Sequence, residues 1–388
     1  MTTAPRIATA IPVPKGLEGV VVADTAVGEV RGQEGFFHYR QYSAVDLAAT
    51  RSFEDVWHLL VCGSLPDAGE GAAFSATVRS LRALPEGLAR LLPAISTVGG
   101  PLDVLRTAVS LLGAELDWQP TFGTDPSDLR DQGLRLGAVV ATILAAAHRL
   151  QAGLAPVEPR ADLGHAANFL WMLHGSEPDP DHAHSLEQYL VLAVDHGLNA
   201  STFAARVITS TGADLAAAVC GAIGALSGPL HGAAPGKVLD MLDQIGDARR
   251  AEQWIRAAVG RGERIMGFGH RVYRTDDPRS TFLRAVALRL GGPLAELAAA
   301  VERTVVDVLA ERKPGRALYT NVEFFAGVVM VACGIPRPML TPTFAAARTI
   351  GWTAHIQEQA ADNRLIRPAA RYVGPPAPVP VPEPARSF

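Results

Sequence analysis

One short segment, residues 265–279, combines a glycine turn with a histidine and several arginines. It reads Ile-Met-Gly-Phe-Gly-His-Arg-Val-Tyr-Arg-Thr-Asp-Asp-Pro-Arg and has no regular period of apolar residues. Glycines let a backbone approach a ligand closely, a histidine can exchange a proton near neutral pH, and arginines bind carboxylates or phosphates. The segment therefore predicts an anion-binding site, with a basic surface loop around a buried histidine as the alternative.

Three further segments place polar residues among apolar ones. They are residues 230–234 (Leu-His-Gly-Ala-Ala), 195–203 (Asp-His-Gly-Leu-Asn-Ala-Ser-Thr-Phe) and 321–325 (Asn-Val-Glu-Phe-Phe). Condensation of a thioester with a keto-dicarboxylate needs a base for the methyl proton, a donor to the developing enolate oxygen, and cations for the carboxylates. The four segments together contain residues of all three kinds.

On these motifs the chain resembles the citrate synthase family, from about residue 16 to residue 374. The resemblance implies a mainly α, two-domain helical fold with a short N-terminal β region, and a homodimeric active unit. It implies a large domain made of residues 1–228 and 322–373 and a small domain of residues 229–321. Residues 374–388 are rich in proline, which cannot donate the hydrogen bonds of helix or sheet, so a flexible tail is expected there.

The resemblance also implies three catalytic residues. Glu323 is the base, and its apolar neighbours are expected to exclude water and raise its proton affinity. His231 donates to the thioester carbonyl, and His270 protonates the ketone of oxaloacetate. The implied reaction joins acetyl-CoA to oxaloacetate and hydrolyses the citryl-CoA intermediate to citrate and CoA, without a metal or a further cofactor.

Two sets of binding residues follow from the same resemblance. A surface ion pair is the alternative for several of the arginines. The set for oxaloacetate is His196, Asn199, Arg279, Arg348 and Arg367, the last reaching across from the other subunit, and the set for CoA is Met266, Gly267, Phe268, Gly269, Arg274 and Arg316.

The chain departs from the family's pattern at three motifs. Glu323 stands where the family has the aspartate of Asn-Val-Asp, residues 196–199 read His-Gly-Leu-Asn instead of His-Glu-Leu-Asn, and residues 231–236 read His-Gly-Ala-Ala-Pro-Gly. These departures indicate a divergent bacterial branch. Two alternatives therefore stay open: a 2-methylcitrate synthase that uses propionyl-CoA, and a non-catalytic paralogue that binds CoA or a polycarboxylate.

Composition excludes several other classes of protein. The formal net charge of −4 argues against a broad basic surface for nucleic acid. The sequence has neither a G-x-x-x-x-G-K-[ST] loop nor a strand-to-helix G-x-G-x-x-G motif, so nucleotide cofactors are not expected. The apolar runs 136–147 and 215–230 are too short to span a bilayer, and no export signal opens the chain, so a cytoplasmic location is expected.

Apolar periodicity and breaker residues predict the elements that position these motifs. Short strands are expected within residues 16–42, and a helix capped by Ser52 and Asp55 should follow. The three cysteines, Cys62, Cys220 and Cys333, are expected in the core. The remaining expectations are surface loops at 119–132 and 155–164, a buried helix at 134–150, two packed helices within 186–226, and an amphipathic helix at 293–312.

Overall fold

A computed structural model describes residues 11–232, 234–270, 272–312, 318–376 and 378–381. The chain divides into two compact units, Thr25–Arg364 and a terminal unit made of Met1–Asp24 and Leu365–Phe388. The predicted boundaries of a small domain at residues 229–321 fall inside the first unit and stay a prediction.

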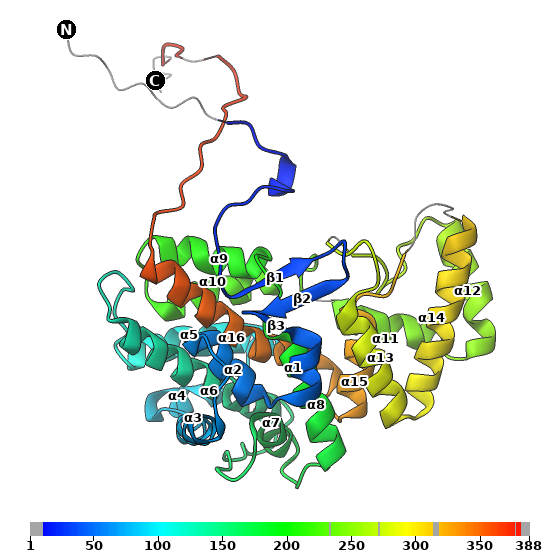
Figure 1. The fold of residues 1–388 in the computed structure, drawn as a ribbon, viewed down its shortest axis with the longest axis horizontal. Helices are drawn as coiled ribbons and strands as arrows, with labels where there is room; N and C mark the ends of the chain where they lie inside the picture. The colour runs from blue at the N-terminus through cyan, green and yellow to red at the C-terminus, as the bar shows by residue number, and fades with distance from the viewer. Residues whose placement is uncertain (1–10, 233, 271, 313–317, 377, 382–388) are drawn as a thin grey trace, which may run out of the picture. The chain divides into compact units, whose positions relative to one another are not determined.

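The described part of the chain is mainly helical, as predicted, with one small sheet (Figure 1). The elements are the strands β1 (Gly28–Arg31), β2 (Phe36–Tyr39) and β3 (Tyr42–Ser43); the α-helices α1 (Ala44–Thr50), α2 (Phe53–Cys62), α3 (Ala68–Ser80), α4 (Glu86–Ile95), α5 (Pro101–Glu115), α6 (Pro126–Gln151), α7 (His165–His174), α8 (Pro180–Ala193), α9 (Ala200–Ser210), α10 (Leu215–Leu226), α11 (Ala234–Ile245), α12 (Ala251–Gly260), α13 (Pro278–Leu290), α14 (Pro293–Arg312), α15 (Val322–Ala332) and α16 (Leu340–Ala361); and the 3-10 turns η1 (Lys15–Leu17), η2 (Ala248–Arg250) and η3 (Arg337–Met339).

The predicted β region is an antiparallel sheet in the order β1-β2-β3. Val30 pairs with Phe37, and Tyr39 pairs with both Gly28 and Tyr42. Phe37 and Tyr39 face the core while Phe36 and His38 are more exposed, which is the period-2 alternation of a sheet covered on one face. Residues 20–22, inside the segment 16–42 where short strands are expected, form no strand.

The capping prediction for α2 is confirmed. The Ser52 side chain accepts from the Asp55 backbone N–H, and the Asp55 carboxylate accepts from the Ser52 N–H. The helix ends where Gly63 adopts a left-handed conformation with φ of 91°. Cys62, the last residue of α2, is exposed, so its predicted place in the core is wrong, whereas Cys333 is buried and Cys220 is partly buried.

The buried helix predicted at 134–150 is the second half of α6. This helix starts earlier than expected, because Asp125 caps it by accepting from the Ser127 N–H, so the predicted loop at 119–132 is shorter. By length and composition α6 could cross a membrane, and 78% of its most apolar window is buried inside the fold. Gly137 allows tight packing there, since a Cβ would lie 2.4 Å from Trp57 and 2.5 Å from Ile350.

The region predicted as two helices within 186–226 contains three, α8, α9 and α10. Asn199 caps α9 by accepting from two backbone N–H groups, and Asp214 caps α10. Each of these caps starts a helix, so the region contains one helix more than predicted. The amphipathic helix at 293–312 is confirmed as α14, and the loop at 155–164 is also confirmed.

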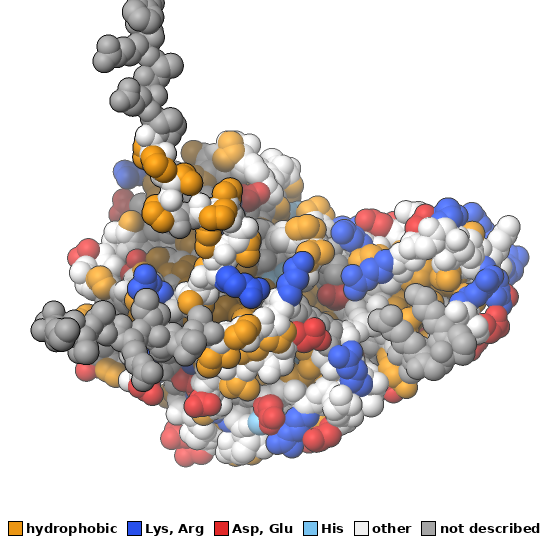
Figure 2. Space-filling view, turned by 90° about the horizontal axis from the view of Figure 1, so that it is seen from above, with side chains coloured by type: hydrophobic (Ala, Val, Ile, Leu, Met, Phe, Trp, Pro, Cys, Tyr) orange, Lys and Arg blue, Asp and Glu red, His pale blue; other side chains and the backbone are white. Residues whose placement is uncertain are grey.

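On the face shown in Figure 2, basic and acidic side chains are interspersed. This agrees with the near balance of 35 Lys and Arg against 39 Asp and Glu residues in the chain. Any attraction of an anionic substrate must therefore come from local groups of arginines.

Candidate active site

Helix α16 packs against the segment that joins α8 to α9 and carries His196 (Figure 1). The Arg348 Nε donates to the Ala193 carbonyl oxygen at 2.8 Å. One turn further along α16, a Cβ on Gly351 would lie 2.2 Å from the Val194 carbonyl oxygen, so only glycine permits this approach. The backbone that precedes His196 is thus held against one face of α16.

A buried polar network continues along the same face. His355 Nε2 lies 3.2 Å from Asp195 Oδ1, and Arg206 donates to His355 Nδ1 at 3.0 Å and to Glu358 at 2.6 Å. Because an arginine is always a donor, the neutral His355 ring carries its proton on Nε2 and donates it to Asp195. Although burial opposes ionisation, His355 and the nearby Arg348 keep the pKa of Asp195 below its ordinary value.

His231 is held by a serine from the start of α9. Its Nε2 lies 2.8 Å from Ser201 Oγ, which also accepts from Trp352 Nε1 at 3.2 Å and lies 2.7 Å from Asn199 Oδ1. In the structure the Ser201 hydroxyl donates its one proton to Asn199 Oδ1. When the hydroxyl rotates and donates to His231 Nε2 instead, the neutral ring carries its proton on Nδ1, where it can donate to a substrate. Burial, with a contribution from Arg348, lowers the pKa of His231 to about 4, so the ring is neutral at pH 7.

His270 is held by the backbone of its own loop. Its Nδ1 accepts from the N–H groups of Val272 and Tyr273, both at 3.0 Å, so the proton of the neutral ring lies on Nε2. That Nε2 is 3.4 Å from an Arg279 nitrogen, NH2. Both groups are donors, so they can converge on one acceptor atom. Burial and then the charge of Arg279 lower the pKa of His270 to about 4.

His196 lies beside these two residues. Its Nε2 is 3.0 Å from the Tyr273 hydroxyl oxygen, and its ring centre is 5.7 Å from that of His270 and 5.6 Å from that of Phe37. Burial, followed by the charge of Arg279, holds the pKa of His196 well below its ordinary value. The ring is therefore a neutral hydrogen-bonding group.

Arg279 is anchored by an aspartate that the sequence interpretation missed. Asp277 accepts from Arg279 Nε at 3.0 Å and from NH2 at 2.8 Å, and both side chains are at most 4% exposed. The same carboxylate accepts from the Val322 N–H at 3.0 Å, at the start of the helix that carries the candidate base. The pairing raises the pKa of Arg279 against the effect of burial. The Asp-Pro-Arg triplet at residues 277–279 was the available signal, but it reads as an ordinary helix N-terminus.

The candidate base, Glu323, sits in the first turn of α15. Asn321 caps this helix by accepting from the Glu323 N–H at 3.2 Å, and its amide donates to the Gly269 carbonyl oxygen at 3.0 Å. The Asn321 N–H donates to the Gly267 carbonyl oxygen at 2.9 Å, so the glycine turn and the base share one scaffold. Burial raises the pKa of Glu323, with Arg279 opposing the shift, in the direction expected from the sequence.

The predicted CoA-binding residues lie on this glycine turn. Gly267 and Gly269 have φ of 79° and 81°, the left-handed region that glycine adopts most easily. Phe268 is buried and packs on Phe324, with ring centres 5.2 Å apart. Arg274 is exposed and Met266 partly buried, while Arg316 lies outside the described residues.

Arg348 is buried, with its guanidinium 4.5 Å from the ring centre of Phe344. Burial lowers the pKa of Arg348, with Asp195 opposing the shift and Arg279 adding to it. Arg367 belongs to the terminal unit, so its part in the site stays a prediction. The predicted residues that the structure brings into one neighbourhood are His196, Asn199, His231, His270, Arg279, Glu323 and Arg348.

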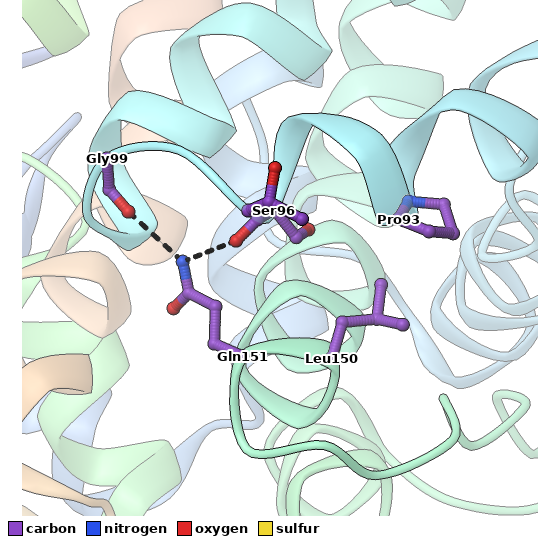
Figure 3. Close-up of a pocket in the computed structure, with 6 residues that line it drawn as sticks. Pro93, Ser96, Gly99, Leu150 and Gln151 are labelled. Atoms are coloured by element: carbon purple, nitrogen blue, oxygen red, sulfur yellow. Dashed lines mark hydrogen bonds between the residues drawn. The ribbon is translucent and has the colours of Figure 1, made fainter.

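A cavity of about 450 Å³ lies elsewhere, between the ends of α4 and α6 (Figure 3). Gln151 Nε2 donates across it to the carbonyl oxygens of Ser96 at 3.3 Å and Gly99 at 3.2 Å. None of the predicted site residues lines it, and its lining side chains carry no charge. Its chemistry does not match an anionic substrate.

The chain is similar to known proteins over most of its length. The family model described as citrate synthase, C-terminal domain, matches residues 16–369. The chain is 42% identical over 382 residues to a 2-methylcitrate synthase of Mycobacterium tuberculosis, covering 96% of this chain and 93% of that protein. It is 41% identical over 365 residues to a citrate synthase of Deinococcus radiodurans, covering 93% of this chain and 95% of that protein.

Solved structures show the same likeness. A citrate synthase from Thermotoga maritima is 36% identical with a TM-score of 0.84, and the match covers 95% of this chain and 98% of that one. The citrate synthase from Thermoplasma acidophilum, solved as a ternary complex with carboxymethyl coenzyme A and oxaloacetate, matches with a TM-score of 0.87 at 28% identity, over 96% of this chain and 99% of that one. The chain therefore belongs to the citrate synthase family.

Proposed function

We propose that this protein condenses acetyl-CoA with oxaloacetate and hydrolyses the citryl-CoA intermediate to citrate and CoA. The observation that carries the proposal is the pair of donors formed by His270 Nε2 and Arg279 NH2, 3.4 Å apart, near the partly buried carboxylate of Glu323 on α15. Two donors at this separation can bind one ketone oxygen, while the carboxylate serves as a base.

The first step removes a proton from the methyl carbon of the thioester. Glu323 takes the proton, and His231 donates a hydrogen bond to the carbonyl oxygen on which negative charge develops. Burial raises the pKa of Glu323, which makes it a stronger base than an exposed carboxylate. The low pKa of His231, about 4, means that the donor is a neutral ring.

The new carbon–carbon bond forms when the enolate carbon attacks the ketone carbon of oxaloacetate. His270 and Arg279 stabilise the oxygen as it becomes an alkoxide, and His270 transfers its Nε2 proton to it. Water then attacks the thioester carbonyl of citryl-CoA, the carbon–sulfur bond breaks, and citrate and CoA leave. Citrate formed in this way would enter the tricarboxylic acid cycle.

The arginines supply the charge that two substrate carboxylates require. Arg279 and Arg348 are held by Asp277 and by a backbone carbonyl, so their orientation is set before the substrate binds. We infer that His196 and Asn199 complete the subsite and that Arg367 of the partner subunit closes it in a homodimer. CoA binds on the glycine turn, with Arg274 and Arg316 near its phosphates, in a cytoplasmic enzyme that needs no metal.

The second candidate is 2-methylcitrate synthesis from propionyl-CoA, which the 42% identity to the mycobacterial 2-methylcitrate synthase supports. The two acyl groups differ by one methylene, and a pocket discriminates one methylene by only about 1–3 kcal/mol. Both reactions use the same base and donors.

Release of the CoA thiol tests the proposal. The purified protein is mixed with oxaloacetate and either acetyl-CoA or propionyl-CoA, and free thiol is followed with a chromogenic reagent. Faster release with one thioester assigns the acyl preference. Absence of thiol with both, while oxaloacetate still raises the melting temperature, would establish the non-catalytic binding protein instead.

A further inference from the structure

The turn between β1 and β2 lies against the loop that carries His270 (Figure 1). The Arg274 N–H donates to the Gly32 carbonyl oxygen at 2.9 Å. A Cβ built on Gly32 would lie 2.2 Å from the Val272 carbonyl oxygen and 3.0 Å from its Cγ1. On the other side of the turn, a Cβ on Gly35 would lie 2.7 Å from Thr275 Oγ1. The two backbones are thus in direct contact, and a side chain at residue 32 has no room.

The same loop residues also contact two imidazoles of the candidate site, those of His270 and His196. The N–H groups of Val272 and Tyr273 both donate to His270 Nδ1 at 3.0 Å. The Tyr273 hydroxyl is 3.0 Å from His196 Nε2. Residues 272–274 therefore contact the turn through the Val272 carbonyl and the Arg274 N–H. They contact the candidate oxaloacetate site through the N–H groups of Val272 and Tyr273 and through the Tyr273 hydroxyl.

We propose that the β1–β2 turn, residues 32–35, is a positioning element for the oxaloacetate subsite, because it fixes residues 272–274 and through them the orientation of His270 and Tyr273. The inference rests on the proposed function, since it concerns the geometry of the ketone-binding donors. None of the turn residues touches the substrate in this proposal. The turn acts only through the loop.

The contact also crosses a boundary that the sequence predicts. Residues 32–35 fall in the predicted large domain, and residues 272–274 fall in the predicted small domain. If the small domain closes over oxaloacetate, the Arg274 N–H to Gly32 hydrogen bond belongs to the closed state. We therefore expect oxaloacetate to slow exchange of the Arg274 amide hydrogen.

Gly32→Ala is the primary variant, because the added methyl group would overlap the Val272 carbonyl and push the loop away. Gly260→Ala is the matched control: Gly260 also lies outside the left-handed region, and a Cβ there would meet nothing within 4 Å. A displacement of about 1 Å in the loop should lower kcat/KM for oxaloacetate by about a hundredfold and raise KM for oxaloacetate. The control should behave like the parent protein.

The split between kcat and KM separates positioning from a loss of folded protein. A smaller folded fraction would lower apparent kcat and leave KM for oxaloacetate unchanged, whereas a misplaced His270 must change KM. Faster exchange of the Arg274 amide in Gly32→Ala, measured by hydrogen exchange, is expected alongside. A Gly32→Ala protein with the parent's kcat/KM and the parent's amide protection would overturn the proposal.

A second variant keeps the proposal testable if Gly32→Ala does not fold. Replacing residues 32–35 with an Asn-Gly dipeptide turns the four-residue loop into a standard two-residue hairpin turn and removes the Gly32 carbonyl that accepts from the Arg274 N–H. The same loss in kcat/KM for oxaloacetate is expected, and parental kinetics would overturn the role of the turn. Absence of thiol release from the parent itself would reject the proposed function instead, so the two failures are distinguishable.

Discussion

His355 Nε2 and Asp195 Oδ1 are 3.2 Å apart, and both side chains are at most 1% exposed. The pair joins the middle of α16 to the residue that precedes His196, across 160 positions of the chain. Since Arg206 occupies the other ring nitrogen of His355, the pair has one arrangement of protons. This contact joins a helix of the core to the residue beside His196, so it should link the stability of the core to the geometry of the proposed oxaloacetate subsite.

Replacing His355 should therefore affect folding and substrate binding together. In His355→Ala the buried charge of Asp195 loses a partner, and removing one member of a buried pair costs about 3–5 kcal/mol. We expect the free energy of unfolding in urea to fall by about that amount and KM for oxaloacetate to rise. His184→Ala, on the exposed side of α8, should change the unfolding free energy by less than about 0.5 kcal/mol. Equal stability of the two variants would contradict the buried pair.

Stability should fall as pH is lowered below about 6.5, because several histidines are buried in the neutral form. Burial lowers the pKa of His165 to about 3 and that of His231 and His270 to about 4. Between these values and the ordinary pKa near 6.5, the unfolded chain binds protons that the folded protein does not, so acid favours unfolding.

The test of this pH dependence is His165→Phe, which keeps a ring between Phe53 and Trp57 and removes the titrating group. The slope of the unfolding free energy against pH gives the number of protons that the chain takes up on unfolding. Between pH 4 and 6 this number should be smaller in His165→Phe than in the parent, by up to about one proton. An unchanged slope would show that His165 does not contribute.

Glu323 should be required for turnover and dispensable for oxaloacetate binding. Glu323→Gln removes the base, and general base catalysis contributes about 10²–10⁴-fold, so thiol release should slow by that factor. Glu323→Asp withdraws the carboxylate by about 1 Å, and a roughly hundredfold loss is expected. Oxaloacetate should still raise the melting temperature of both variants. Undiminished turnover by Glu323→Gln would assign the base to another residue.

Asp277 should hold Arg279 in place for the substrate. Asp277→Asn leaves a buried guanidinium without its carboxylate, so a loss of about 3 kcal/mol in unfolding free energy and a higher KM for oxaloacetate are expected. Asp276→Asn, at the exposed neighbouring position, is the control. KM values for oxaloacetate that are the same in both variants would exclude the positioning role of Asp277.

Arg367 should act in the site of the other subunit. Arg367→Ala and Arg279→Ala are each expected to lower turnover severely. If the site is shared, hybrid dimers of the two variants contain one site with both arginines, so mixing under mild denaturant and refolding should restore activity. Continued inactivity of the mixed dimers, with hybrid formation shown by mass spectrometry, would place Arg367 in its own subunit's site or outside the site.

The sequence by itself determined the features that depend on neighbours in the chain. The capping box of Ser52 and Asp55, the left-handed glycines at 267 and 269, and the amphipathic α14 all follow from hydrogen bonds or side-chain spacing within a few residues. Motif residues such as His231 and His270 were found because the four segments that contain them could be interpreted as a set.

Only the tertiary structure decided which side chains support those motifs. Asp277 looked like an ordinary cap, and nothing local to His355 or Ser201 indicated that they hold Asp195 and His231. The contacts of Asp277 with the Val322 N–H, of His355 with Asp195 and of Ser201 with His231 join residues far apart in sequence, so they form only when the helices pack together. The early start of α6 and the start of α10 follow from the local caps Asp125 and Asp214, which apolar periodicity alone does not reveal. The exposure of Cys62 depends on which surfaces meet, and that is a property of the packed fold.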